Sequence, residues 1–270
     1  MFPMRSKRRQ SRRQVSIDAP ASIPVKSRRM LRRQLSDRGA GGEPGFRWRG
    51  REVTRLEGFT DAVFAFAVTL LVVSLEVPKS LSEFVEAMRG FVLFGICFSL
   101  LAYVWYMHYR FFRRYGLENP WAVFLNCLLL FFVLFYVYPL KFLFRAALAQ
   151  QPFSDAEGRM LYTVFALGYA AVFAVFALLY LHAWRMRAEL ALSAIELLRT
   201  RRGLLDQLAL VGVGVASALL SRLLPPSFLN LAGLVYLLVP VYFICSGAIW
   251  GRRERRLQSA PAAVELRGEP

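Results

Sequence analysis

Cysteine is scarce in this sequence, and the three cysteines that occur stand far apart. Cys97, Cys127 and Cys245 each lie inside an apolar stretch, and no Cys-x-x-Cys pair occurs. This spacing gives no sign of a secreted disulfide framework. We interpret the three residues as small apolar packing residues.

The sequence also lacks the residue patterns that most enzymes and secondary transporters require. It has two histidines, and it shows no metal-ligand cluster, no paired carboxylates and no nucleophile–base spacing. We therefore expect no enzyme activity, no metal site and no cofactor. A pair of Gly- or Pro-broken spans with central charges, as expected of a transporter, is also missing.

Long apolar runs are what the sequence has in abundance. Of its 270 residues 56% are hydrophobic and 20% are charged, and the mean hydropathy is +0.40. Six runs approach or exceed the roughly 20 residues that cross a bilayer as a helix: 56–77, 91–107, 121–140, 160–184, 204–224 and 228–250. None shows the alternation of barrel strands. The sequence therefore predicts an all-α membrane protein with six transmembrane helices per subunit.

The ends of the chain differ from this apolar middle. Residues 1–51 contain fifteen Lys or Arg but only three acidic residues, and they have no apolar run. We predict a disordered basic cytoplasmic tail over 1–51 that attracts anionic lipids. Without a folded reading module we expect no nucleic-acid partner. A transmembrane domain over 52–251 and a second basic tail over 252–270 complete the predicted organisation.

Basic residues alternate between the predicted loops. They are concentrated in the N-terminal segment, in the loops after spans two and four, and at the C-terminus, whereas the other loops are poorer or mixed. Lys and Arg favour the cytoplasmic side. An even number of spans also puts both termini on one side. We therefore expect a multi-pass protein of the cell membrane with both termini in the cytoplasm.

Three polar residues are expected at one depth in the membrane. Asp61 lies about 8 Å inside span one at a rise of 1.5 Å per residue, and Asn126 lies similarly deep in span three. His108 ends span two on the same side. Each alone is typical of an ordinary interhelical hydrogen bond. Together they favour a connected polar network, because an ionised Asp61 requires partners, either these residues or Arg55.

One face of span one carries a narrow apolar stripe. At 100° per residue the stripe contains Phe59, Phe66, Leu70, Val73 and Val77, with Thr69 at its edge. Asp61 points away from it. The stripe is therefore free to face a pore or a symmetry mate, while an ordinary lipid-facing or helix-facing surface is the alternative.

The segment RLEGFTDAVFAFAVTLLV resembles the first helix of the transmembrane protein 175 family, the endosomal and lysosomal potassium channels and their prokaryotic relatives. The mark of that family, R-x-x-x-F-S-D, occurs here as Arg55, Phe59, Thr60 and Asp61, with Thr in place of Ser. Further similarity lies in three polar anchors of spans two and three, Trp105, His108 and Asn126. The specific resemblance covers about residues 55–140.

The resemblance implies a homotetramer whose pore is lined by the first span of each subunit. A single six-span unit is similar to the prokaryotic type. Carried over, the narrowest ring falls on Phe66, the next layers on Leu70 and Val73, and a hydroxyl ring on Thr69. The family usually has Ile or Leu at the first position, so the bulkier Phe66 is a departure. No TVGYG filter occurs, in the family or in this sequence.

The resulting hypothesis is a potassium-selective, or weakly selective, cation channel with potassium as the permeant ion. Apolar rings would control passage by size and dewetting. A structural polar network would hold span one in place: Arg55, Phe59, Thr60, Asp61, Trp105, His108 and Asn126. The alternatives are a non-conducting membrane scaffold or sensor of the same fold, and a proton-permeable channel.

Overall fold

The structure is a computed structural model that describes residues 43, 45–50, 52–73, 80–149 and 154–265. Within these residues the chain forms helices joined by short turns and loops, and no strand. All of them belong to one compact unit that begins at Glu43.

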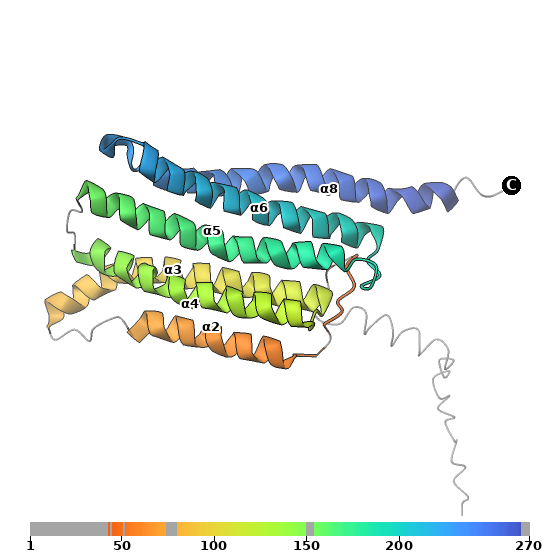
Figure 1. Cartoon of the computed structure of the whole chain (residues 1–270), viewed down its shortest axis with the longest axis horizontal. Helices are drawn as coiled ribbons and strands as arrows, with labels where there is room; N and C mark the ends of the chain where they lie inside the picture. The colour runs from red at the N-terminus through yellow and green to blue at the C-terminus, as the bar shows by residue number, and fades with distance from the viewer. Residues whose placement is uncertain (1–42, 44, 51, 74–79, 150–153, 266–270) are drawn as a thin grey trace, which may run out of the picture. The chain divides into compact units, whose positions relative to one another are not determined.

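Six long helices account for most of the described chain. They are α2 (Arg55–Val73), α3 (Leu81–Tyr115), α4 (Pro120–Ala149), α5 (Asp155–Arg185), α6 (Ala194–Leu223) and α8 (Leu238–Glu265). Three short pieces, η1 (Pro226–Phe228), α7 (Leu231–Leu234) and η2 (Val235–Leu237), connect α6 to α8. Each long helix overlaps one of the six apolar runs, and Figure 1 shows them lying along one common direction.

Four stretches of the described chain are long and apolar enough to cross a membrane: Pro120–Pro139, Asp155–Arg185, Ala194–Leu223 and Pro226–Leu257. The protein is therefore an all-helical membrane protein. The other two predicted spans fall on α2 and α3. Neither of these helices is among the four stretches, so the count of six spans stays a prediction.

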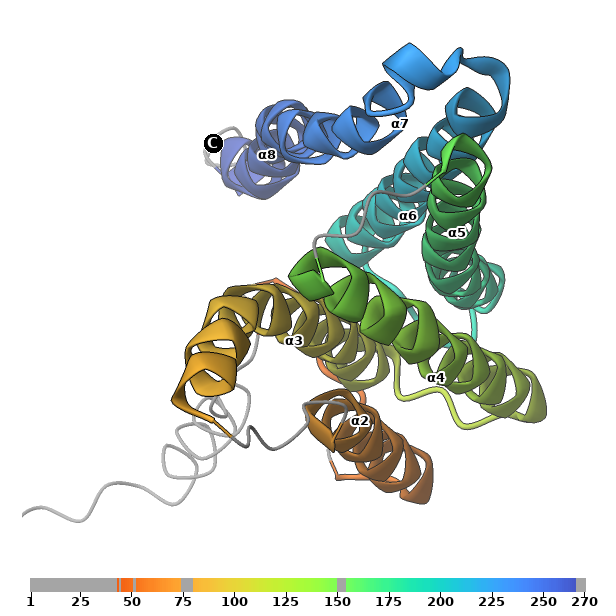
Figure 2. The ribbon, with the colours of Figure 1, turned by 90° about the vertical axis from the view of Figure 1, so that its left-hand side faces the viewer.

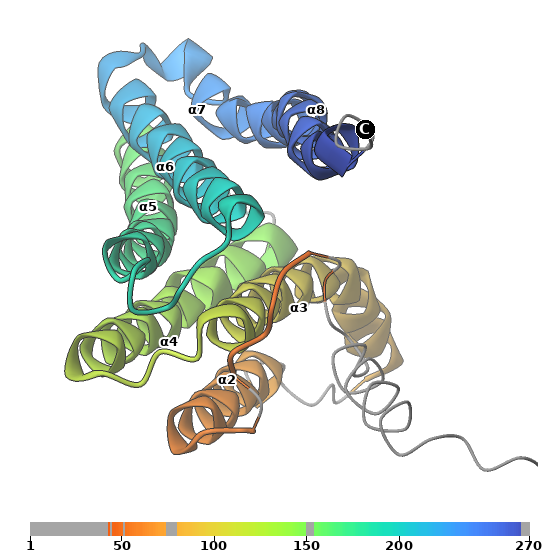
Figure 3. The same cartoon turned by 90° about the vertical axis from the view of Figure 1, so that its right-hand side faces the viewer.

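The helices pack in a defined order. α5 and α6 lie side by side, and α4 lies between α2 and α5 (Figures 2 and 3). Small residues allow α5 and α6 to approach closely, because a Cβ on Gly203 would clash with the Tyr180 ring. A Cβ on Gly214 would lie 3.0 Å from the carbonyl oxygen of Ala166. These glycines fix the spacing of the two helices.

The helices α5 and α6 begin at capping boxes on opposite ends of this pair. Ser154 and Glu157 start α5, and Ser193 and Glu196 start α6. In each box the serine hydroxyl accepts from the glutamate backbone N–H, and the glutamate carboxylate accepts from the serine backbone N–H. These four bonds satisfy backbone donors that a helix start leaves unpaired.

The described part of the expected N-terminal tail packs against the helices. Phe46 is only 5% exposed and contacts Tyr115 edge to face. The backbone N–H groups of Arg49 and Gly50 both donate to the carbonyl of Arg113, at 3.1 and 3.2 Å. This stretch therefore differs from the expectation of disorder across 1–51. Residues 1–42, 44 and 51 of that tail lie outside the described residues.

The predicted C-terminal boundary also falls inside an element. α8 continues without interruption through residue 252 to Glu265, so the first part of the expected tail over 252–270 is helical. Arg199 of α6 pairs with Glu254 in this extension. The helix therefore extends beyond its apolar segment and carries charged residues to a partner on α6.

Candidate functional site

The α2 helix starts in a capping box of its own. The Thr54 hydroxyl accepts from the Glu57 N–H at 3.1 Å, and the Glu57 carboxylate accepts from the Thr54 N–H at 3.0 Å. Glu57 is buried, and the Arg113 side chain of α3 lies 3.8 Å from it. These contacts fix the position of the first turn of α2 against the end of α3.

A buried chain of hydrogen bonds then links α2 to α3 and α4. The Asn126 amide donates to the Thr60 hydroxyl at 2.9 Å, and the Thr60 hydroxyl donates to the Leu56 carbonyl at 2.8 Å. His108 Nε2 lies 2.7 Å from Asn126 Oδ1 and donates to it in this arrangement. Thr60, His108 and Asn126 are each at most 1% exposed. Every one of these buried side chains is therefore paired, as buried polar groups require.

Asp61 makes a different contact from its neighbour Thr60. Its carboxylate accepts from Trp105 Nε1 at 2.8 Å, on the exposed side of the α2–α3 contact. Arg55, expected as an alternative partner, is exposed and makes no hydrogen bond or ion pair with any described residue. The structure thus brings together Thr60, Asn126 and His108 in one chain and Asp61 and Trp105 in a second contact, and leaves Arg55 outside both.

Part of the predicted stripe of α2 lies on its outer face. Phe59 and Phe66 are each 56% exposed, whereas Leu70 is partly buried against the core. The Thr69 hydroxyl is exposed and donates to the Phe66 carbonyl at 2.7 Å, so its oxygen still has acceptor capacity. The Val73 side chain and residue Val77 lie outside the described parts of the chain. Within one chain the described stripe has large apolar side chains without neighbours on their outer side.

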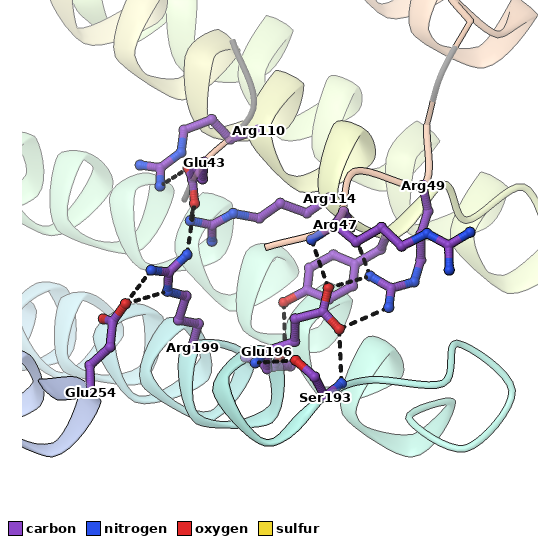
Figure 4. Close-up of polar contacts among 11 residues, drawn as sticks. Glu43, Arg47, Arg49, Arg110, Arg114, Ser193, Glu196, Arg199 and Glu254 are labelled. Atoms are coloured by element: carbon purple, nitrogen blue, oxygen red, sulfur yellow. Dashed lines mark hydrogen bonds and ion pairs between the residues drawn. The ribbon is translucent and has the colours of Figure 1, made fainter. Parts of the chain in front are cut away.

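Sequence reasoning missed a cluster of ion pairs at the end of the bundle that holds the start of α2. Glu43 binds Arg110 at 2.5 Å through Oε1 and Arg114 through Oε2, and Arg199 lies 3.9 Å from the same Oε2 (Figure 4). Burial raises the pKa of Glu43, but Arg114 and Arg110 outweigh it and hold the pKa below its usual value. Glu43 is therefore ionised at neutral pH.

A second carboxylate, that of Glu196, fixes the rest of this segment. It accepts from the Arg47 N–H at 2.8 Å, from both terminal nitrogens of Arg49 at 3.0 and 2.9 Å, and from the Ser193 N–H at 2.8 Å. The signal in the sequence was the acidic residues themselves: Glu43, Glu196 and Glu254 each lie in a segment rich in arginine. Acidic residues in such basic segments are candidates for ion pairs.

These ion pairs also bring the basic regions together in space. The N-terminal segment contacts the end of α3 through Arg110 and Arg114 and the start of α6 through Glu196, and α6 contacts the second half of α8 through Glu254. Four regions predicted to lie on one side of the membrane are thus at one end of the helix bundle (Figures 1 and 4). In the described residues no group of three or more His, Cys, Asp or Glu side chains could hold a metal ion.

Comparison with known proteins gives a consistent answer. Residues 55–136 match the family model described as "Endosomal/lysosomal potassium channel TMEM175". A protein from Marivirga tractuosa named "Potassium channel" is 34% identical over 243 residues, which cover 83% of this chain and 98% of that protein. A protein from Chamaesiphon minutus named as a potassium channel is 29% identical over 140 residues, which cover 49% of this chain and 66% of that protein.

Two solved structures resemble the fold as well. A crystal structure of a variant of the potassium channel MtTMEM175, in complex with a nanobody fusion protein, is 34% identical with a TM-score of 0.69, and the match covers 78% of this chain and 99% of that one. The structure of a lysosomal potassium-selective channel TMEM175 homolog from Chamaesiphon minutus is 26% identical with a TM-score of 0.50, covering 71% and 96%. The match to the Marivirga protein spans nearly its whole length, and the same arrangement of helices recurs in a solved channel. This chain therefore belongs to the TMEM175 family of potassium channels, which is a family of ion channels and not of enzymes.

Proposed function

We propose that this protein is a channel that conducts potassium passively across a membrane. The observation that carries the proposal is the similarity, over nearly the full length of the Marivirga protein, to a protein named as a potassium channel. The outer face of α2 supports it, because Phe59, Phe66 and Thr69 are exposed on a helix whose other face is packed within the chain. Such a face is available to line a path between copies.

The pore of the proposed channel forms between four copies of the chain. One α2 helix per subunit cannot enclose a path, so a closed ring of subunits is needed. In this ring Phe66 forms the narrowest layer, and Leu70 and Val73 form the next layers. Thr69 oxygens replace part of the hydration shell of the ion, while the apolar rings limit the path by size and dewetting. Mass measurement in mild detergent tests the assembly, and a monomer would contradict it.

The two hydrogen-bonded groups hold α2 in place beside this path. Thr60, Asn126 and His108 tie the inner face of α2 to α3 and α4, and Trp105 ties Asp61 to α3. In this proposal they position the pore helix and do not touch the ion. Arg55 was expected in the same group, but its side chain lies apart from these contacts.

Both termini lie in the cytoplasm of the proposed channel, which spans the cell membrane six times. The gathering of the basic regions at one end of the bundle supports this orientation, since Lys and Arg favour the cytoplasmic side. A cysteine introduced at Arg187, in a protein without its native cysteines, should resist an impermeant thiol reagent in intact cells. Rapid labelling in intact cells would show that this loop lies outside the cell and would contradict the proposed orientation. Residues 1–42 lie outside the described residues, so their expected attraction to anionic lipids stays a prediction.

Potassium flux in proteoliposomes tests the function. Purified protein should dissipate a potassium gradient faster than protein-free vesicles, without added energy, and should pass potassium faster than sodium. A double variant, Thr69→Phe with Phe66→Trp, serves as the matched control. Its larger side chains should block the proposed path, so it should not conduct. Equal potassium leak from vesicles with and without the protein would reject the channel.

The residue type at position 66 favours a second candidate function. Four Phe66 rings in one layer have more bulk than the Ile or Leu usual in the family, and a blocked path would leave a non-conducting scaffold or sensor. A narrow path that excludes potassium but passes protons is the other possibility. The same vesicles with a pH-sensitive dye separate the three cases, because proton flux without potassium flux identifies the last of them.

A further inference from the structure

A polar pocket at the basic end of the bundle has no part in the proposed ion path. Its volume is about 540 Å³, and its walls come from α3, α5, α6, α8 and Glu43. Four of its lining side chains are arginines and three are carboxylates, so it carries excess positive charge. Figure 4 shows its charged part, in which Glu43 lies between Arg110 and Arg114, with Arg199 beside them.

Glu43 occupies this pocket in the way that a bound anion would. Each of its carboxylate oxygens binds a different guanidinium, from Arg110 and Arg114, and the third guanidinium, from Arg199, stays 3.9 Å away. Glu43 lies outside every helix. Its carboxylate can therefore leave the arginines without breaking a helical hydrogen bond.

The pocket has more hydrogen-bonding capacity than Glu43 uses. The buried Nε atoms of Arg110 and Arg114 have no acceptor among the described residues, and buried Gln207 Oε1 has no donor there. Buried polar atoms are normally paired, so each unpaired atom requires an explanation. A ligand with more acceptor oxygens than a carboxylate, together with a hydroxyl donor, would pair both kinds of atom.

A phosphomonoester meets these requirements better than the carboxylate does. It offers three acceptor oxygens and a charge of about −1.5 to −2 at neutral pH, where Glu43 offers two oxygens and one charge. Arginine forks bind such groups with good geometry. We propose that this pocket binds the phosphomonoester of a hydroxyl-bearing ligand, which displaces the carboxylate of Glu43 from Arg110, Arg114 and Arg199. The ligand is either the headgroup of a membrane lipid or a small soluble molecule, since both present the same chemistry.

Calorimetric titration of the full-length protein in detergent tests the proposal with two probes. Glycerol phosphate represents the soluble source, with glycerol as its control. Short-chain phosphatidylinositol monophosphate represents the lipid source, with short-chain phosphatidylinositol, which lacks the monoester, as its control. Binding of either phosphorylated probe but not its control supports the proposal and identifies the source. Binding of neither, by the protein or by Glu43→Gln, overturns it.

Glu43→Gln is the most informative variant, because it removes the competing charge and nearly preserves the shape. Loss of an internal charged competitor should tighten binding of the phosphorylated probe by about tenfold or more. Misfolding cannot produce tighter binding, so this gain is free of the usual ambiguity. If Glu43 serves only to attach the segment, Glu43→Gln leaves the affinity unchanged or lowers it, and the proposal fails.

Arginine variants locate the site. Arg114→Gln and Arg110→Gln should each weaken binding about tenfold or more, in proteins that keep the wild-type assembly size. Arg187→Gln removes the same charge from the loop after α5, outside the pocket, and should leave the affinity unchanged. Equal losses in all three variants would indicate non-specific attraction to a basic surface and would reject the pocket. The wild-type protein should bind glycerol phosphate more tightly than inorganic phosphate, because a ligand hydroxyl can donate to Gln207 Oε1. Gln207→Leu should abolish this preference. None of these measurements depends on ion flux, so the pocket and the channel can fail separately.

Discussion

The two faces of α2 have similar apolar content but opposite surroundings. The inner face carries Thr60, Phe64, Ala67 and Leu71, all buried against the rest of the chain. The outer face carries Phe59, Phe66 and Thr69, all exposed. Hydropathy does not separate the two faces. The difference shows that a single chain is enough to bury the inner face. The outer face can be covered only by lipid or by further copies of the chain.

Hydrogen bonding separates the faces more sharply than apolarity does. On the inner face the Thr60 hydroxyl is bonded within its own helix and to α4, so it is committed to holding the helix. On the outer face the Thr69 hydroxyl is bonded only to its own helix, which leaves its oxygen open to a partner outside the chain. We therefore expect inner-face changes to alter stability and outer-face changes to alter conduction.

The largest effect is expected from Asn126→Ala on the inner side. This change removes the partner of Thr60 and His108 and leaves both polar groups buried without it, at a cost of about 2–3 kcal/mol. Unfolding of the purified protein in detergent, followed by tryptophan fluorescence, measures the loss. Asn230→Ala changes an exposed asparagine in the α6–α8 connection and should cost far less. Equal stability of the two variants would mean that the inner face is not held by this chain of bonds.

Phe66→Ala tests the outer face. If Phe66 forms the constriction, the smaller side chain widens and hydrates the ring and raises cation flux about tenfold, a change of about 1.4 kcal/mol in the barrier. Discrimination between potassium and sodium should weaken, while the stability of the assembled protein changes little. Phe66→Leu should retain both measurable flux and selectivity. Lower stability with no gain of flux would assign Phe66 to packing.

Trp105→Phe tests the contact at the border between the two faces. It removes the donor to Asp61 and nearly keeps the ring volume, with an expected loss of about 1 kcal/mol of stability. Asp61→Asn keeps an acceptor for Trp105 and is the matched control, with a smaller loss. Unfolding measurements on both variants compare them. A changed potassium-to-sodium flux ratio in Asp61→Asn would instead place Asp61 on the ion path.

The smallest change in stability is expected from Thr69→Val on the outer face. Valine keeps the branched shape and removes the hydroxyl oxygen, so stability should change by less than about 0.5 kcal/mol. In the flux assay this variant should lose selectivity more than rate. Thr60→Val makes the same chemical change on the inner face and should lower stability without changing selectivity. If the two valine variants behave alike, the distinction between the faces is wrong.

The apolar runs and the positions of polar residues along them could be read without a structure. Each predicted run overlaps one long helix. The runs could be recognised as membrane-crossing helices because the rise per residue sets how many residues cross a bilayer. The reasoning from depth grouped Asp61, His108 and Asn126, and the structure pairs His108 with Asn126. It also gives Asp61 a different partner, Trp105, because neighbouring positions on a helix point about 100° apart.

The sequence by itself determined the class of the protein, the number of long helices and the accumulation of basic residues in alternate loops. These follow from local periodicity and from charge counts. Tertiary structure alone decided that Glu196 accepts from Arg47, which is 149 residues away, and that Glu43 lies among arginines of α3 and α6. Charge counts show that each basic segment contains only a few acidic residues. Only the packing of the helices determines which arginines reach them, since ion pairing acts over a few ångströms and the sequence does not give those distances.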